Sequence, residues 1–272
     1  MKHVKITFKI QPGTDSDILV ARLADIGYDG FEETETELLA YISEADFNEN
    51  ELKTVADNSQ VEYVTEIIPE QNWNALWESN FQPVIVDGFC TIRAHFHDIT
   101  VTTPYDIIIT PKMSFGTGHH ATTQLMMAMM KDMPLKGSEV LDFGTGTGVL
   151  AILAEMLGAA KVLAIDNDPW CIENSIENAE RNKCKNITVQ IGSLEDAPPH
   201  REDVILANIN RHILLHYMAG LYERLKSTGM ILMSGLLTED EPVVIEAALK
   251  AGFSFIKGQE QNGWIALLFR KE

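Results

Sequence analysis

The sequence has 272 residues, of which 45% are hydrophobic, and its formal net charge at pH 7 is −19. This composition is typical of a globular protein and excludes a disordered or fibrous chain. The strong acidity argues against direct binding to DNA or RNA phosphates. The three widely spaced cysteines argue against a disulfide framework, and no apolar run approaches the length of a membrane span. We therefore expect a cytoplasmic protein.

The first part of the chain, residues 1–68, is predicted to be a small α+β domain. Strand-like alternation of apolar and polar side chains covers residues 3–10, 37–43 and 61–68. An amphipathic helix is expected to begin at Asp15 or Ser16 and end near Gly27, and residues 47–58 have room for a second. This order favours a ferredoxin-like sandwich, in which helices pack on an antiparallel sheet.

The acidic residues are concentrated near the start of the chain. Residues 1–70 hold 5 Lys or Arg against 16 Asp or Glu. Such a surface would attract and steer a basic protein partner. The same charge could also serve only to keep the protein soluble, and both interpretations stay open here.

A connector and a second domain follow. Residues 69–82 are predicted to form a linker helix, in which Trp73 and Trp77 pack one turn apart on a neighbouring domain. Residues 83–110 are rich in strand patterns. Beyond them, strand patterns cover 138–143, 161–166, 187–191, 203–208, 230–235, 253–260 and 263–270. Helix patterns stand between most of these strands, which predicts a mostly parallel sheet covered on both faces, with an antiparallel edge at the end of the chain.

The segment VLDFGTGTGVLAI places Gly144, Gly146 and Gly148 between a strand pattern and a helix pattern. In an open α/β sheet the ligand sits outside the carboxyl ends of the strands, next to this first turn. Glycines leave room there for an adenosyl group and adopt turn dihedrals that other residues resist. The GxGxG spacing differs from the GxGxxG fingerprint of dinucleotide sites and resembles motif I of class I S-adenosylmethionine methyltransferases. A purely structural turn is the alternative.

Three acidic residues accompany this turn. Asp166 ends the next strand pattern, 22 residues after Gly144, where a carboxylate can accept hydrogen bonds from both ribose hydroxyls. Asp168, followed by Pro169, is expected to cap the next helix. Asp142 has two open interpretations, since it could face the positively charged methionyl part of a cofactor or brace the turn.

Asn208 ends the fourth strand pattern of the second domain. Amine methyltransferases commonly have a polar residue here, whose carbonyl can receive a hydrogen bond from the amine or the cofactor. An asparagine that merely forms a turn is the alternative.

His119 and His120 are adjacent in the sequence, so their side chains should point in different directions. No third potential ligand stands at helical spacing from them, and no metal site is predicted. The methionine-rich residues 125–130 are predicted to be helix core.

Together these segments resemble the ribosomal protein L-eleven methyltransferases, the PrmA family, over most of residues 69–240. The resemblance is carried by NWNALWESNFQPV, SFGTGHHATT, VLDFGTGTGVLAI, LGAAKVLAIDNDPWCIENSIENAERN and VILANI. It implies a ferredoxin-like substrate-recognition domain at 1–68, a linker helix at 69–82, and a Rossmann-like catalytic domain at 83–272 whose seven-stranded sheet is mostly parallel. It also implies methylation of lysine side-chain amines and of the N-terminal amine of that basic ribosomal protein, with S-adenosylmethionine as donor and no metal.

The resemblance also assigns roles to single residues. The cofactor contacts are expected at Thr117, Thr123, Asp142, Gly144, Gly146, Asp166 and Asn208. Asn208 and Phe115 are expected to act in catalysis, with Phe115 and Thr117 in a loop over the methionyl end of the cofactor. The family commonly shows THPTT where this chain has HHATT, so the chain departs from the family at His119 and Ala121.

Two alternatives stay open at the level of the sequence. One is a class I methyltransferase that acts on another protein or on a small amine, because such an enzyme would share every cofactor residue. The other is a non-catalytic adenosyl-binding adaptor for basic proteins. The intact Gly144, Asp166 and Asn208 argue against the second.

Overall fold

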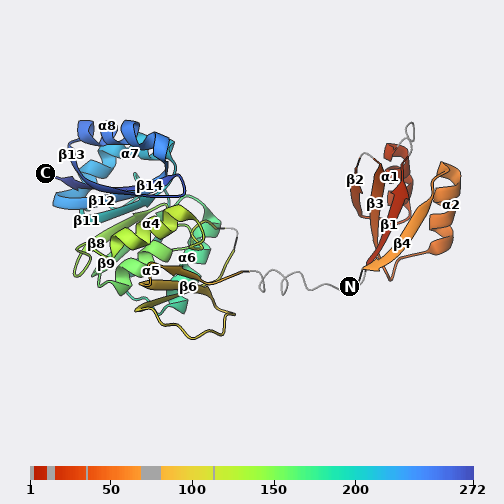
Figure 1. Cartoon of the computed structure of the whole chain (residues 1–272), viewed down its shortest axis with the longest axis horizontal. Helices are drawn as coiled ribbons and strands as arrows, with labels where there is room; N and C mark the ends of the chain where they lie inside the picture. Colours follow the sequence, from red (N-terminus) through yellow and green to blue (C-terminus); the bar gives the residue numbers. More distant parts are fainter. Residues whose placement is uncertain (1–2, 11–15, 35, 69–80, 113) are drawn as a thin grey trace. The chain divides into compact units, whose positions relative to one another are not determined.

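The computed structural model describes residues 3–10, 16–34, 36–68, 81–112 and 114–272 (Figure 1). The chain divides into two compact units, residues 1–80 and 81–272. No described helix is long and apolar enough to cross a membrane.

The expected linker helix falls almost wholly outside the described residues, and so do Trp73 and Trp77. Its last two positions, Phe81 and Gln82, are described and are not helical. Pro83 follows them, and the ring of a proline biases the preceding residue away from the helical conformation. The prediction of a helix at these two positions is therefore wrong.

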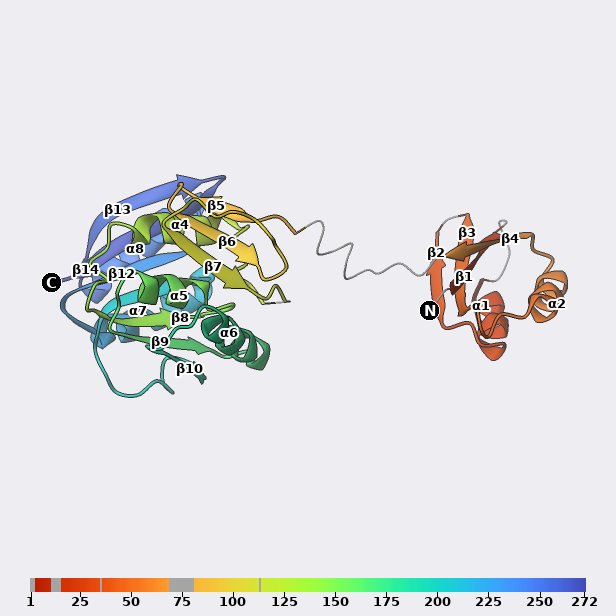
Figure 2. The same ribbon diagram turned by 90° about the horizontal axis from the view of Figure 1, so that it is seen from below.

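The N-terminal unit is a four-stranded antiparallel sheet with two helices, in the strand order β2-β3-β1-β4. Its elements are β1 (His3–Lys9), α1 (Ser16–Asp25), β2 (Gly30–Glu33), β3 (Glu37–Ser43), α2 (Glu49–Ser59) and β4 (Tyr63–Ile68). Both helices bury apolar side chains in the same core as β1 and β3. This βαββαβ order is that of a ferredoxin-like sandwich, as expected (Figure 2).

Alternation along β1 explains this core. Val4, Ile6 and Phe8 are buried, and the residues between them lie on the opposite face of the sheet. The short strand β2 was not expected, because its four residues, GFEE, offer a single large apolar side chain. It forms an edge of the sheet through backbone pairing with β3, which local side-chain patterning does not reveal.

The C-terminal unit contains a seven-stranded sheet in the order β10-β9-β8-β11-β12-β14-β13. Its strands are β8 (Glu139–Phe143), β9 (Lys161–Asp166), β10 (Ile187–Ile191), β11 (Glu202–Asn208), β12 (Leu225–Leu237), β13 (Phe253–Gln261) and β14 (Trp264–Lys271). The pairs among β8 to β12 are parallel, and β14 pairs antiparallel with both β12 and β13. The predicted parallel sheet with an antiparallel edge is confirmed.

Helices cover both faces of this sheet (Figure 1). They are α4 (Ala121–Met130), α5 (Val149–Met156), α6 (Pro169–Arg181), α7 (Arg211–Arg224) and α8 (Glu241–Ala251), with a short 3-10 turn at Thr238–Asp240. Along β11, Val204 and Leu206 pack with α4 and α5, whereas Ile205 and Ala207 pack with α7 and α8. The methionines of α4 are buried in the first of these cores, which confirms that they are helix core.

A smaller sheet stands beside the large one. It consists of β5 (Val84–Val86), β6 (Cys90–Ala94) and β7 (Tyr105–Ile109), which contact α4, α5 and α6.

In the large sheet, β12 begins at Leu225 rather than at Met230 as predicted. The earlier start arises because Leu225 is buried and pairs with Glu202 of β11, a long-range contact that the polar sequence KSTG conceals.

Candidate active site

A cavity of about 880 Å³ opens at the carboxyl ends of β8, β9 and β11. Strand ends and loops from distant parts of the C-terminal unit meet there, as they do at ligand sites of open α/β sheets. Of the predicted site residues, the cavity lining includes Phe115, Thr123, Gly144, Gly146, Asp166 and Asn208. Asp142 and Thr117 do not line it.

The glycine-rich turn forms one wall of the cavity. Gly144 and Gly146 have positive φ angles of +78° and +56°. A Cβ atom at Gly144 would lie 2.3 Å from the Ile209 side chain, and one at Gly146 would lie 2.3 Å from the backbone oxygen of Phe115. Both the backbone conformation and the space therefore require glycine at these two positions. Gly148 is the N-cap of α5, also with positive φ.

Asp166 lies at the end of β9 and braces the same turn. Its Oδ2 accepts a hydrogen bond from the backbone N–H of Gly146 at 2.9 Å, and its Oδ1 accepts one from the N–H of Asp168 at 3.1 Å. A carboxylate oxygen can accept more than one hydrogen bond, so the half-buried Asp166 retains acceptor capacity at the cavity wall. Asp168 caps α6 by accepting from the N–H of Trp170, and this prediction is confirmed.

Asp142 is fully buried behind the turn. The hydroxyl of Thr145 donates to its Oδ2 at 2.6 Å, and Thr145 lines the cavity. Burial raises the pKa of Asp142 to about 7, because a charged carboxylate is poorly solvated there. Of the two interpretations left open by the sequence, this geometry favours bracing of the turn over direct contact with a ligand.

Asn208 and Thr123 meet on another wall of the cavity. The side-chain N–H of Asn208 donates to the hydroxyl oxygen of Thr123 at 3.5 Å. The carbonyl Oδ1 of Asn208 is buried, and it has no hydrogen-bond partner among the described residues. A buried carbonyl without a partner is costly, which makes this atom a candidate acceptor for a ligand N–H.

Residues 114–120, here called the active-site loop, are hydrogen-bonded to the glycine-rich turn. The N–H of Thr147 donates to the backbone oxygen of Phe115 at 2.9 Å, and its hydroxyl donates to the backbone oxygen of Gly116 at 2.7 Å. The Phe115 side chain is 52% exposed and lines the cavity. Thr117 points elsewhere, because its hydroxyl lies 3.1 Å from Nδ1 of His119.

Two further cavity residues were not singled out from the sequence as site residues. The ring of His120 lies 5.2 Å from that of Phe115 and 4.6 Å from that of Trp264, both edge-on. Nδ1 of His120 accepts from the N–H of Thr122 and so caps α4. Trp264 comes from β14, and no local pattern connects it with the glycine-rich turn. The described residues contain no cluster of three or more potential metal ligands.

The site fits an adenosyl cofactor. It combines a turn that requires glycine, a carboxylate with further acceptor capacity at the end of β9, and the carbonyl of Asn208, which has no partner in the part of the chain that the structure describes. With the order of the seven-stranded sheet, these features define a class I methyltransferase, whose cofactor is S-adenosylmethionine.

Comparison with known proteins identifies the family. The family model described as ribosomal protein L11 methyltransferase (PrmA) matches residues 14–272. A ribosomal protein L11 methyltransferase from Porphyromonas gingivalis is 42% identical over 99% of this chain and 98% of its own length. Another, from Chlorobaculum tepidum, is 34% identical over 98% of this chain and 96% of its own length. The crystal structure of a ribosomal protein L11 methylase from Lactobacillus delbrueckii subsp. bulgaricus is 30% identical, with a TM-score of 0.66 over 71% of this chain and 100% of that one. The chain belongs to the PrmA family.

Proposed function

We propose that this chain transfers methyl groups from S-adenosylmethionine to lysine side-chain amines and the N-terminal amine of ribosomal protein L11. The family and the names of relatives that match nearly the whole chain support the protein substrate. The observation that supports an amine as acceptor is the buried Oδ1 of Asn208, which lacks a partner among the described residues and belongs to a cavity-lining side chain. A cytoplasmic location is part of the same proposal.

The cofactor supplies a methyl group bound to positively charged sulfur. The task of this chain is to align an amine for in-line attack, and alignment alone can contribute a large share of catalysis. Thr123 accepts the amide N–H of Asn208, which leaves the Asn208 carbonyl to accept a hydrogen bond from the incoming amine. Phe115, on the active-site loop, is proposed to exclude water from the reacting groups.

The acceptor amine must be neutral before it can attack. A lysine amine with a pKa of about 10.4 is neutral roughly once in 2,500 at pH 7, which costs about 4.6 kcal/mol, whereas an α-amine near 7.7 costs about 1 kcal/mol. Desolvation and a neighbouring positive charge both lower the pKa of an amine. The proton released from the amine is proposed to pass to water.

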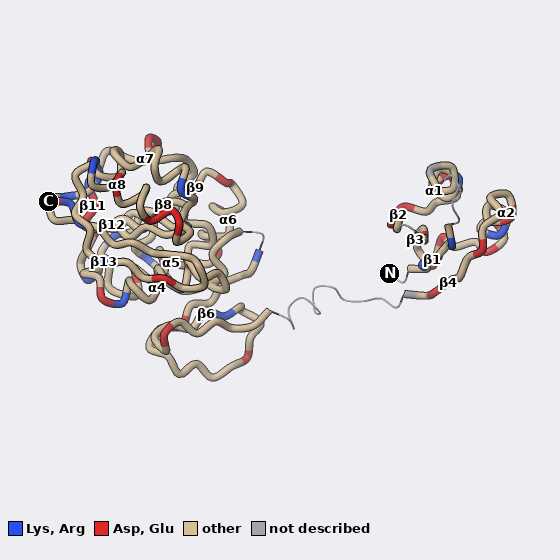
Figure 3. The backbone as a smooth tube through the Cα atoms, turned by 45° about the horizontal axis from the view of Figure 1, so that its top comes forward, with Lys and Arg blue, Asp and Glu red and all other residues tan. Residues whose placement is uncertain are grey.

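The acidic N-terminal unit is proposed to recognise the substrate. Residues 1–70 hold 16 Asp or Glu, and Figure 3 shows those among the described residues distributed over several elements of this unit. Of its basic residues, Lys5 is already paired with Glu66. A surface of this charge attracts a basic protein and raises its rate of encounter. Residues 83–272 would then hold the cofactor, with residues 69–82 as the linker.

A transfer assay tests this proposal. The full chain is incubated with labelled S-adenosylmethionine and purified large-subunit ribosomal proteins, and the labelled sites are mapped by mass spectrometry. Label on L11 lysines and on its N-terminal amine, formed about 10- to 100-fold more slowly by Asn208→Ala, is the expected result. Transfer to another protein or only to small amines would overturn the substrate, and cofactor binding without any transfer would indicate an adaptor.

A further inference from the structure

Two histidine side chains form hydrogen bonds with consecutive backbone carbonyls, those of Phe81 and Gln82, at the start of the C-terminal unit. Nε2 of His97 lies 2.6 Å from the backbone oxygen of Phe81, and Nε2 of His119 lies 3.0 Å from the backbone oxygen of Gln82. A carbonyl oxygen can only accept, so both Nε2 atoms carry the proton and donate it. The Phe81 ring also contacts both imidazole rings, at 6.0 Å from His97 and 4.7 Å from His119.

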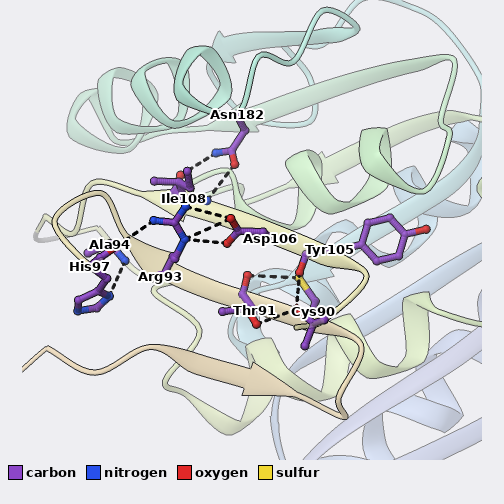
Figure 4. Close-up of polar contacts among 10 residues, drawn as sticks. Cys90, Thr91, Arg93, Ala94, His97, Tyr105, Asp106, Ile108 and Asn182 are labelled. Atoms are coloured by element: carbon purple, nitrogen blue, oxygen red, sulfur yellow. Dashed lines mark hydrogen bonds and ion pairs between the residues drawn. The ribbon is translucent and has the colours of Figure 1, made fainter. Parts of the chain in front are cut away.

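His97 links this segment to the small three-stranded sheet. Its Nδ1 accepts a hydrogen bond from the N–H of Ala94, at the end of β6 (Figure 4). Its backbone oxygen accepts from Arg93, which is itself paired with Asp106 of β7. Every partner of His97 in this network other than Phe81 therefore belongs to the small sheet or to the turn that follows β6.

His119 ties the same segment to the active-site loop. Its Nδ1 faces the hydroxyl of Thr117, two residues earlier in the loop. The side chain of Gln124, in α4, donates to the backbone oxygens of both Gly118 and His119, at 3.0 and 3.2 Å. The same loop carries Phe115 into the cavity, where its backbone oxygen accepts from Thr147 of the glycine-rich turn.

We propose that His119 is a positioning residue that couples the active-site loop to the segment Phe81–Gln82. Its effect on turnover rests on the proposed function, in which Phe115 of this loop excludes water from the reacting groups. His97 links Phe81 to the small sheet, and His119 links Gln82 to the loop that carries Phe115.

Hydrogen exchange in the full chain tests this coupling without any assumption about the substrate. His119→Ala is expected to increase amide exchange in a peptide covering residues 114–120. His97→Ala is the matched control, because it loses a contact to the same segment but none to the loop. It is expected to increase exchange near residues 81 and 95–97 only. Unchanged exchange in the loop of His119→Ala, or an equal increase in His97→Ala, would overturn the proposal.

Steady-state kinetics on the protein substrate provide the second measurement. His119→Ala is expected to lower kcat by about 10- to 100-fold, because small misplacements of aligned groups have effects of this size. The Kd for S-adenosylmethionine should stay within about twofold, since His119 does not line the main cavity. His119→Gln can still donate to Gln82 and accept from Thr117, and it should restore most of the activity.

The outcomes separate this inference from the proposed function. If the wild-type chain fails to methylate L11, the proposed function fails, and the exchange experiment still decides the role of His119. If L11 is methylated at the wild-type rate by His119→Ala, the coupling is wrong although the function stands. Equal losses of kcat in His97→Ala and His119→Ala would likewise reduce both histidines to a structural role.

Discussion

The side-chain nitrogen of Asn208 lies 3.5 Å from the hydroxyl oxygen of Thr123, which joins the end of β11 to the first turn of α4. This contact sets the orientation of the Asn208 amide. Because its N–H group is directed to Thr123, the carbonyl Oδ1 is left without a partner among the described residues. The pair thus provides an acceptor of fixed direction at the edge of the cavity.

Replacement of Asn208 by alanine should impair turnover more than cofactor binding. Loss of an interaction that aligns the reacting amine lowers kcat, and we expect a fall of about 10- to 100-fold with a change in the Kd for S-adenosylmethionine below about threefold. Thr123→Ser keeps the oxygen that orients the amide and serves as the control for Thr123→Val. Equal losses in kcat and in cofactor affinity for Asn208→Ala would remove the alignment role.

Asp166→Ala should weaken S-adenosylmethionine binding by about 1.5–3 kcal/mol, or roughly 10- to 150-fold, because ribose hydroxyls would lose a charged acceptor. Titration calorimetry measures the change. Asp168→Ala is the matched control: it removes the N-cap of α6, which should cost about 1 kcal/mol of stability, and although Asp168 also lines the cavity, it should weaken cofactor binding far less than Asp166→Ala. An unchanged Kd in Asp166→Ala would exclude the ribose role.

Gly146→Ala and Gly137→Ala separate the effect of backbone conformation from that of space. Both glycines have positive φ, but a Cβ at Gly137 meets no atom within 4 Å, whereas one at Gly146 would lie 2.3 Å from the backbone oxygen of Phe115. Gly137→Ala should cost about 1 kcal/mol of stability and leave cofactor binding unchanged. Gly146→Ala should also displace the active-site loop and reduce cofactor affinity by at least tenfold, which calorimetry on folded protein can measure.

The buried Asp142 should make the cofactor-free protein less stable as pH rises. Burial raises its pKa to about 7, above the value of about 3.9 expected when unfolded. Between these values the unfolded state has lost the proton and the native state still binds it, so unfolding releases a proton and is favoured by higher pH. The loss should be about 1.6 kcal/mol from about pH 5.5 to pH 7.

Denaturant unfolding of wild type and Asp142→Asn, compared at each pH, isolates this contribution. The amide does not titrate, so the variant should gain stability relative to wild type as pH rises through that window. Contributions of all other groups, including those of the N-terminal unit, cancel in the comparison. A constant difference between the two proteins from pH 5.5 to pH 8 would show that Asp142 titrates normally.

The sequence by itself determined the class of fold and the position of the site within it. Strand and helix periodicities are local, so the alternating pattern predicted the parallel sheet and its antiparallel edge. Parallel strands place their carboxyl ends at one edge of the sheet, and this rule predicts a common site for Gly144, Asp166 and Asn208, all of which line the cavity. The cap at Asp168 was equally local, since it depends on residues two positions apart.

Only the tertiary structure decided which side chains meet at that cavity and which stand behind it. Trp264 reaches His120 from the last strand, and Asn208 reaches Thr123 across 85 residues of sequence. Asp142 has the sequence context of a ligand contact, yet its strand buries it behind the turn. The contacts of His119 with Phe81 and Gln82 were hidden for the same reason: they depend on how loops from separate strands pack, and no periodicity of the chain encodes those distances.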